Sequence, residues 1–398
     1  MSTPILGYPT GGKMCRIPVF ITGKNNTLTN DQLQAMSLSL RIGTGLASAS
    51  GTADYALSKD YSIDEVINFE ISDLIRDQFL HDFSIYDGQG YINSPDGEIL
   101  WVVPTGDWRY SDNGAVPTET IWANSTTYKF LAYDGWFDDT QNVGGYTGVP
   151  LYVSRNRFVL ANQYGLLGVN NSFSEIEITW NNGDSDTFYD TATSSTPPAP
   201  AGVTTTSVIY AGVYPQNLED NPYLDNAIKP STHETGEYYD VVFKNEIGDV
   251  MATERFTLTC EPKYTPYQLS FINRFGVLDY LTFFKRSDER GNFTQESYQK
   301  SIYNDAFTSP SASVGKYTSY NINSRNSYTL NTGFVGEDHD EVMEDILMSE
   351  QVCLLIGGEW VAVVPERGSI EYQKHVNQKL INYTMTFNKG FDQRNLVR

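Results

Sequence analysis

Turn dipeptides that recur at short intervals between alternating polar and apolar runs constrain the fold of this chain most strongly. Asn-Gly and Asp-Gly pairs in such a setting are typical of β-hairpin turns. Between residues 83 and 187 such pairs are Asp87-Gly88, Asp96-Gly97, Asn113-Gly114, Asp134-Gly135 and Asn182-Gly183, and Gly144-Gly145 is a further turn dipeptide. The 398 residues suffice for two or three domains. The pattern predicts a mainly β protein built from β-sandwich or barrel domains.

The stretch from Thr259 to Ser287 is predicted to be a hairpin or corner around which the chain is organised. Its first part, from Gln268 to Phe271, alternates with period two, as a half-buried strand does. Residues 273–276 interrupt the pattern, and a nearly apolar run from Tyr280 to Phe284 follows. We expect the aromatic residues of this pair of strands to anchor one lobe of the protein.

Two short helices are expected among the strands. Ser72 is suited to the N-cap of the first, and Ile75 and Phe79, four residues apart, share its apolar face. The second is expected to open at residues 337–340, whose acidic side chains favour a helix N-terminus. Its predicted apolar side consists of Val342, Ile346 and Leu347.

Composition and loop length indicate three sections. Residues 1–84 are predicted to be an N-terminal β part, residues 85–253 a β-rich insert with long loops, and residues 254–398 a C-terminal β domain with one helix that packs with 1–84. Residues 191–206 are rich in Pro, Ser and Thr and are typical of an exposed linker. The polar loop at 215–237 is too long for a simple connection.

The charge balance excludes several classes of partner. With 49 acidic and 27 basic residues the formal charge is −22, which argues against a nucleic-acid binder or a protein that docks on an anionic membrane. No apolar run reaches the ~20 residues of a membrane span. The first residues lack the pattern of a signal peptide, so synthesis and folding in a cytoplasm are expected. The three cysteines, Cys15, Cys260 and Cys353, are expected to be buried thiols.

No catalytic, cofactor-binding or metal-binding motif stands out, so the chain is expected to be no enzyme and to need no cofactor. The four histidines lie far apart, and the motifs of zinc proteases, serine hydrolases, phosphate loops and dinucleotide folds are all missing. Asp184, Asp186 and Asp190 form either a loose cation loop or, as we favour, a solvated turn without the spacing of a calcium loop.

Tryptophans in the middle section allow an alternative function. Trp101, Trp108 and Trp136, near Trp122 and Tyr133, could form a platform on which a sugar stacks. The more ordinary interpretation of such residues in an all-β domain is core filling.

Three segments resemble virion structural proteins of tailed bacteriophages. They are CEPKYTPYQLSFINRFGVLDYLTFFKRSDE at 260–289, NQKLINYTMTFNKGFDQRNLVR at 377–398 and YALSKDYSIDEVINFEISDLIRD at 55–77. The resemblance covers both ends of the chain and implies a tail, baseplate or neck (connector) component of the virion. Such proteins assemble with other virion proteins, commonly as homo-oligomeric rings that exchange arms. The resemblance carries no catalytic residues.

Three hypotheses follow, in order of preference. The first is a non-enzymatic phage structural protein that forms a ring, whose negative charge would suit a channel that repels passing DNA; a generally acidic surface explains the charge equally well. The second is a receptor- or carbohydrate-binding tail module that uses Trp101, Trp108 or Trp136. The third is a glycan-cleaving enzyme, for which no site is recognisable in the sequence.

Overall fold

The computed structural model describes most of the chain in segments. They are residues 5–7, 12–24, 33–43, 53–60, 66–84, 90–93, 97–110, 118–121, 129–136, 150–170, 173–190, 208–261, 263–300, 315–367 and 381–394. These residues form several β-sheets and three short α-helices, without a closed barrel, so the predicted mainly β fold with sandwich-like domains is confirmed.

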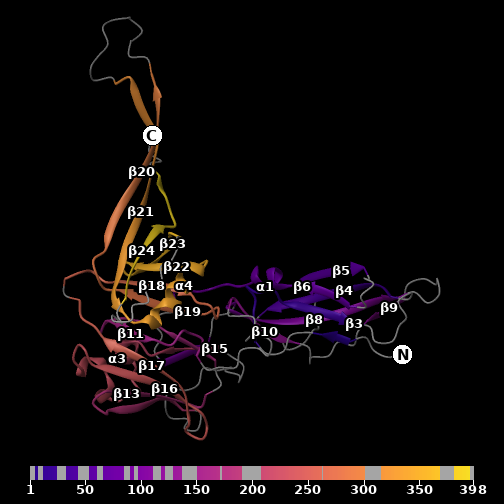
Figure 1. Ribbon diagram of the computed structural model, residues 1–398, viewed down its shortest axis with the longest axis horizontal. Coiled ribbons are helices and arrows are strands. Elements are labelled where there is room, and N and C mark those ends of the chain that lie inside the picture. The colour runs from indigo at the N-terminus through magenta and orange to yellow at the C-terminus, as the bar shows by residue number, and fades with distance from the viewer. Residues whose placement is uncertain are drawn as a thin grey trace, which may run out of the picture. The chain divides into compact units, whose positions relative to one another are not determined.

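The chain divides into two compact units. Figure 1 labels their strands and helices and colours them along the sequence. Unit 1 comprises Met1–Cys260 and Ile272–Asp279, and unit 2 comprises Glu261–Phe271 and Tyr280–Arg398. Residues 1–84 and 85–253 therefore belong to the same unit. The expected packing of 1–84 with 254–398 stays a prediction.

The first part of unit 1 contains a three-stranded and a six-stranded sheet. Strand order is β1-β3-β6 in the smaller sheet and β2-β10-β8-β4-β5 in the larger, with β9 added to β8. All pairs are antiparallel except β2–β10. The strands are β1 (Ile5–Gly7), β2 (Gly12–Met14), β3 (Phe20–Lys24), β4 (Leu33–Gly43), β5 (Tyr55–Asp60), β6 (Val66–Glu70), β8 (Ile99–Tyr110), β9 (Thr118–Ile121) and β10 (Phe130–Tyr133).

One hydrophobic core joins these two sheets. Alternate side chains of β4 and β8 contribute to it, as period-two patterning requires, together with Ile21 of β3 and Phe69 of β6. Helix α1 (Ser72–Arg76) adds Ile75 to the same core. The N-cap position is Ile71 and not Ser72, because Ser72 is already helical, so the predicted cap was wrong by one residue. Phe79 is buried but lies beyond the helix end.

The second part of unit 1 contains a five-stranded and a three-stranded sheet. Their orders are β11-β17-β16-β13-β14 and β12-β15-β7, and β11–β17 is a parallel pair. The strands are β7 (Gly90–Asn93), β11 (Asn156–Val159), β12 (Leu167–Asn170), β13 (Glu175–Trp180), β14 (Ser185–Asp190), β15 (Val208–Gly212), β16 (Tyr238–Lys244) and β17 (Val250–Leu258). Along β16 every second residue is buried, as in a strand that packs through one face.

The long polar loop at 215–237 contains short helices that the sequence analysis did not predict. They are α3 (Pro215–Asp220), η1 (Asn226–Ile228) and η2 (Pro230–Thr232). Pro215 occupies the first helical position, where its missing N–H costs nothing. The loop is held down by Trp180, whose Nε1 donates to the Ile228 carbonyl at 2.9 Å and whose ring stacks on His233.

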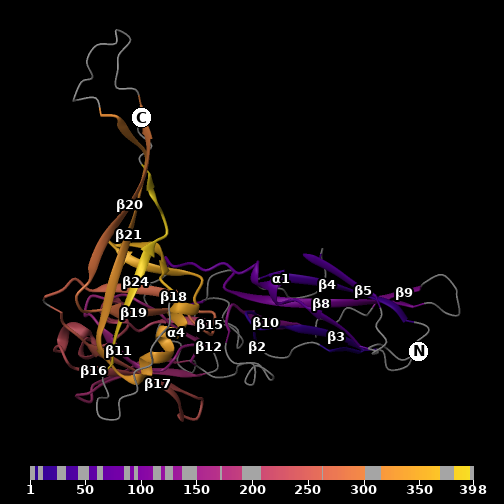
Figure 2. The same cartoon turned by 45° about the horizontal axis from the view of Figure 1, so that its top comes forward.

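Unit 2 is organised around one eight-stranded sheet of order β19-β18-β22-β23-β24-β21-β20, with β25 added to β21 (Figure 2). The strands are β18 (Tyr267–Ile272), β19 (Leu278–Phe283), β20 (Asp288–Gln299), β21 (Tyr317–Val335), β22 (Val352–Ile356), β23 (Glu359–Pro365), β24 (Ile381–Lys389) and β25 (Gln393–Arg394). β21, with 19 residues, is the longest of these strands.

The predicted second helix consists of η3 (Glu337–His339) followed by α4 (Asp340–Met348). Val342 and Ile346 are buried as expected, while Leu347 is half-buried. Asp340, at the start of α4, accepts a hydrogen bond from the Tyr383 hydroxyl of β24.

The predicted turns have mixed outcomes. Asn182-Gly183 joins β13 to β14 as a hairpin turn, with Gly183 at a φ of +96°. Asp96-Gly97 does not make a hairpin, because β7 and β8 belong to different sheets. Gly135 approaches the backbone of Arg274 closely, so its lack of a side chain serves packing. Asp87-Gly88, Asn113-Gly114, Gly144-Gly145 and the segment 191–206 lie outside the described residues.

Gly276 provides a test of the packing at the tip of the β18–β19 hairpin. Its φ is +80°, and an added Cβ would lie 2.6 Å from the backbone N and C of Asp134. Gly276→Ala is expected to destabilise unit 1 by about 3 kcal/mol, because strain and overlap add. The matched control is Gly248→Ala, with a φ of +85° but no atom within 4 Å, which should lose about 1 kcal/mol. Equal losses in denaturant titrations would contradict the proposed crowding.

Candidate functional site: an exposed two-stranded ribbon

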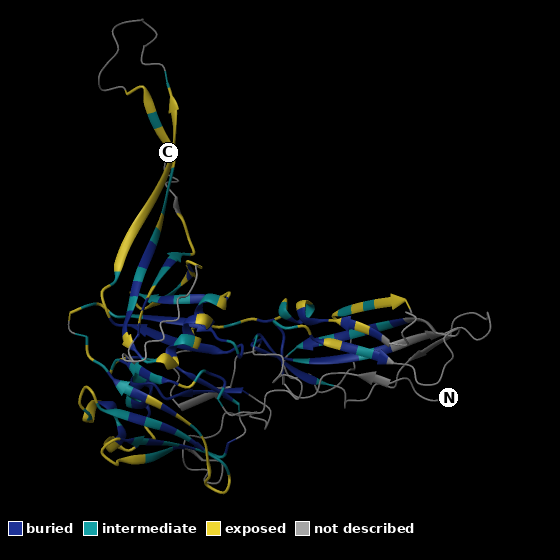
Figure 3. Cartoon of the chain, viewed as in Figure 1, coloured by how far each residue is buried: buried dark blue, intermediate teal, exposed yellow. Residues whose placement is uncertain are grey.

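The most unusual surface of the protein is the ribbon that β20 forms with residues 317–326 of β21. All twelve residues of β20 are exposed, and buried residues in β21 begin only at Ser327 (Figure 3). An isolated pair of strands is marginally stable in water, because neither face is covered. A ribbon of this length without a buried face is therefore a candidate interaction surface.

The outer edge of β20 is open. Among the described residues, β20 pairs with β21 alone, whereas β21 is paired on its other side with β24 and β25. Successive N–H and C=O groups along an edge strand point outward and can bind a further strand. Proteins usually protect such an edge with charged side chains, especially Lys, with Pro or with a bulge. β20 contains four charged residues but neither Lys nor Pro, and its central residues 291–295 are uncharged.

The ribbon also carries exposed aromatic side chains. The exposed fractions are 75% for Phe293, 50% for Tyr298, 70% for Tyr317 and 40% for Tyr320. Tyr298 and Tyr320 form an edge-to-face pair with ring centroids 5.7 Å apart. A hydrogen bond to Glu296 raises the pKa of Tyr320. Aromatic residues are enriched in protein interfaces, so these side chains suit a contact surface.

A bulge in the ribbon belongs to β21 and leaves β20 regular. Thr294 pairs with Asn323 and Glu296 with Tyr320, so two residues of β21 oppose the single residue Gln295. One of the two, Asn321, has a φ of +48°, a left-handed conformation that Asn tolerates better than most residues. Side chains along β20 therefore keep strict alternation between the two faces.

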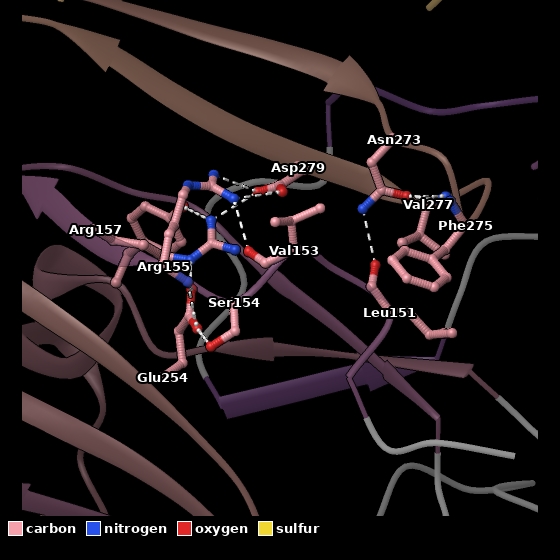
Figure 4. Close-up of polar contacts among 11 residues, drawn as sticks. Leu151, Val153, Ser154, Arg155, Arg157, Glu254, Asn273, Phe275, Val277 and Asp279 are labelled. Atoms are coloured by element: carbon pink, nitrogen blue, oxygen red, sulfur yellow. Dashed lines mark hydrogen bonds and ion pairs between the residues drawn. The ribbon is translucent and has the colours of Figure 1, made fainter. Parts of the chain in front are cut away.

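The tip of the β18–β19 hairpin, Ile272–Asp279, is fixed within unit 1 by a buried ionic network (Figure 4). Asp279 accepts hydrogen bonds from Arg155 at 3.1 Å and from Arg157 Nη1 at 2.6 Å. Arg157 Nε also donates to Glu254 at 2.5 Å. The two guanidinium and two carboxylate groups balance in charge, as buried ions must.

The pKa values of Asp279 and Arg157 favour permanent charge, whereas at Glu254 burial outweighs the two arginines and raises the pKa of the carboxyl group. Burial pushes the pKa of Asp279 upward, but the guanidinium groups of Arg155 and Arg157 outweigh burial and hold it below its ordinary value. Burial lowers the pKa of Arg157, but the negative charge of Asp279 raises it by more, so the net change is an increase. A carboxylate that is satisfied and ionised in this way is a poor proton donor or acceptor, so the network is structural and positions the hairpin tip.

Asn273 completes the attachment of the tip. Its Oδ1 accepts the backbone N–H of Phe275 at 2.9 Å, which shapes the turn, and its Nδ2 donates to the Leu151 carbonyl at 2.8 Å. The backbone N–H of Leu278 donates to the Tyr210 hydroxyl at 3.1 Å. The stretch identified in the sequence as central is thus bonded to segments more than 60 residues away.

Glu98 is a second buried acid. Its side chain is fully buried, and the Tyr210 hydroxyl and the Asp82 backbone, which interact with its carboxyl group, do not outweigh the cost of burial. Burial raises the pKa of Glu98 to about 8. The group is therefore largely protonated at neutral pH.

The structure does not bring the candidate sugar-stacking tryptophans together where it describes them. Trp101, in β8, has the Lys129 ammonium 4.3 Å from its ring centroid, and Trp136 has the Arg16 guanidinium at 5.2 Å. No ring contact links these two side chains within the described residues. The backbone of Trp108 pairs with Met36, but its side chain lies outside the description, as does Trp122. Sugar binding stays a prediction.

The remaining candidate residues take ordinary structural places. Cys15 is buried, but Cys353 is half-buried and Cys260 is exposed, so the prediction of three buried thiols was wrong. His81 bonds to Asp134 at 3.0 Å, and Asp134 also binds Arg16. The side chains of His233 and His339 are almost fully buried, and His375 lies outside the described residues.

The acidic cluster of the sequence lies in the β13–β14 hairpin. Asp184 accepts a hydrogen bond from Asn182 at 2.7 Å, and Asp186 accepts the backbone N–H of Asp225. Asp190 pairs with Glu175 at the end of β14. The described residues contain no group of three or more side chains placed to hold a metal ion. Across these same residues, the helices are all too short or too polar to cross a membrane.

Comparisons with known proteins leave the family open. No protein-family model and no curated protein matches the chain. Among solved structures, the BSP domain of a biofilm-associated protein aligns with 82% of this chain and 64% of its own, slightly under two thirds, at 8% identity and a TM-score of 0.16. A score this low carries no argument about fold or function.

Removing one carboxylate tests the ionic network. Asp279→Asn is expected to destabilise unit 1 by about 3–5 kcal/mol, because the buried arginines lose a counter-charge. The matched control is Asp240→Asn, which breaks the partly exposed Asp240–Arg255 pair and should cost less than about 1 kcal/mol. Denaturant titrations of both variants measure the difference. A wild-type midpoint for Asp279→Asn would contradict the assigned role.

Glu98 predicts a pH dependence of stability. Because its pKa is raised in the folded state, its contribution to stability is complete below the unfolded pKa of about 4.5 and is lost as the pH rises to about 8. Each pH unit in that window removes up to about 1.4 kcal/mol. Glu98→Gln should therefore be close to wild type at pH 4 and more stable at pH 9. Denaturation at both pH values checks this, and parallel pH profiles would contradict it.

Proposed function

We propose that this chain is a non-enzymatic structural component of a tailed-phage virion, in the tail, baseplate or connector. It acts there by assembly with copies of itself and with other virion proteins. The observation that carries the proposal is the ribbon of β20 and β21, in which all twelve residues of β20 are exposed. The resemblance of residues 55–77, 260–289 and 377–398 to phage structural proteins supports it from the sequence side.

The physical argument concerns uncovered strands. A monomeric protein that functions alone gains nothing from twelve exposed strand residues with an open edge, and such an edge promotes association. In an assembly the same groups become satisfied when the ribbon docks. The proposed ring would form through heterologous contacts, since a surface that meets a different surface on the next copy can close a circle.

Two other features fit the proposal. The formal charge of −22 keeps unassembled copies soluble and would repel DNA that passes through a channel. The buried groups with the strongest hydrogen bonds, Asp279 and the two arginines, are saturated by one another and thus structural.

Shortening the ribbon tests the proposal. Replacing residues 292–325 with Asn-Gly leaves Gly291 and Asn326 as the last strand pair, closed by a two-residue hairpin turn. Negative-stain electron microscopy of concentrated wild-type protein is expected to show particles with rotational symmetry. The shortened variant should melt like wild type but fail to form them. Symmetric particles from the shortened variant, or monomers from both proteins, would overturn the role of the ribbon in assembly.

A further inference from the structure

The open edge of β20 has a self-complementary sequence. Its residues are DERGNFTQESYQ, and the central part, residues 291–295, is uncharged. Arg290 and Glu296 lie three residues to either side of Phe293. Because β20 is regular, these two side chains lie on the same face of the ribbon.

We propose that two copies of this chain pair antiparallel through the outer edges of β20, about a two-fold axis at Phe293. The two ribbons then merge into one continuous four-stranded sheet. This inference rests on the proposed role of the ribbon in assembly and names its partner as a second copy.

The charges select this register. When Phe293 lies opposite Phe293 of the second copy, Arg290 lies opposite Glu296, and the symmetry makes this pair twice. Opposite charges directly across two strands attract, and like charges repel. A shift by one residue in one direction places Glu289 opposite Glu296, and a shift in the other direction leaves both charges of the Arg290–Glu296 pair opposite neutral residues.

The state of these side chains in the single chain agrees with the pairing. Within the described residues, Arg290 has no ion-pair partner, although its neighbour Arg286 binds Asp288. Glu296 interacts with the Tyr320 hydroxyl, and the pairing would add a cation to it. Phe293, 75% exposed, would gain an aromatic partner across the axis.

A two-fold contact is isologous and closes after two copies. The contact therefore joins copies in pairs, and a ring built from such pairs closes through a second, heterologous surface. Once two copies have paired, the β20 edge of each is occupied, so this contact cannot add a third copy.

A charge exchange tests the register. Sedimentation velocity over a concentration series should show that Arg290→Glu and Glu296→Arg each weaken pairing by about tenfold, since each creates two like-charge pairs. The double variant Arg290→Glu/Glu296→Arg should restore wild-type pairing. Melting curves must remain unchanged, because both residues are exposed. A double variant no better than the single variants would overturn the register.

Cysteine cross-linking tests the axis. In a Cys260→Ser background, Phe293→Cys places the two introduced thiols opposite each other, within the Cα separation that a disulfide spans. Oxidation should give a covalent dimer of the full-length protein. The control Gln299→Cys puts its two thiols ~40 Å apart and should remain uncross-linked. Equal cross-linking of both variants, or of neither, would overturn the axis.

These outcomes separate the inference from the proposed function. If the shortened ribbon abolishes symmetric particles but Phe293→Cys gives no dimer, the ribbon is an assembly surface with another partner, and the β20 pairing is wrong. If the shortened ribbon changes nothing, the proposed function of the ribbon fails as well.

Discussion

The fold of unit 1 depends on the desolvation of two guanidinium groups. Arg155 and Arg157 are almost completely buried, and their charges are balanced by Asp279 and Glu254 alone among the ion pairs described. Removing ions from water is costly unless each is paired and hydrogen-bonded. A fold that buried one of the four groups without its partners would therefore be strongly destabilised. This requirement fixes the hairpin tip relative to β11 and β17 far more strictly than apolar packing would.

In unit 2 the strands of one sheet differ widely in burial. β19 has all six residues buried, whereas all twelve residues of β20 at the other end of the same sheet are exposed. One sheet thus contains a strand suited to a core and a strand suited to water or to a partner. The proposed role of β20 as an interaction surface rests on its exposed aromatic side chains, its charge pattern and its regular backbone.

Sequence patterns predicted strands that contribute buried side chains. The run from Gln268 to Phe271 and the apolar run from Tyr280 to Phe284 predicted β18 and β19, and Asn182-Gly183 predicted the turn between β13 and β14. β20 was not predicted, because a strand without a buried face need not alternate between polar and apolar residues. Helix α3 was hidden by its polar sequence, although Pro215 marked its start. Asp279, the partner of Arg155, lies 124 residues away in the sequence. Local sequence patterns carry no information about contacts over such a separation.

The route of the chain between the units has a consequence for biosynthesis. The chain leaves unit 1 after Cys260, returns with Ile272 and leaves again after Asp279. During N-to-C synthesis, Arg155 and Arg157 are made 124 and 122 residues before Asp279. A chain that ends before Asp279 therefore has a first unit without one of its two counter-ions, and such a chain would be open to proteolysis and aggregation. The stability of the first unit thus depends on a carboxylate that is translated only with the later hairpin.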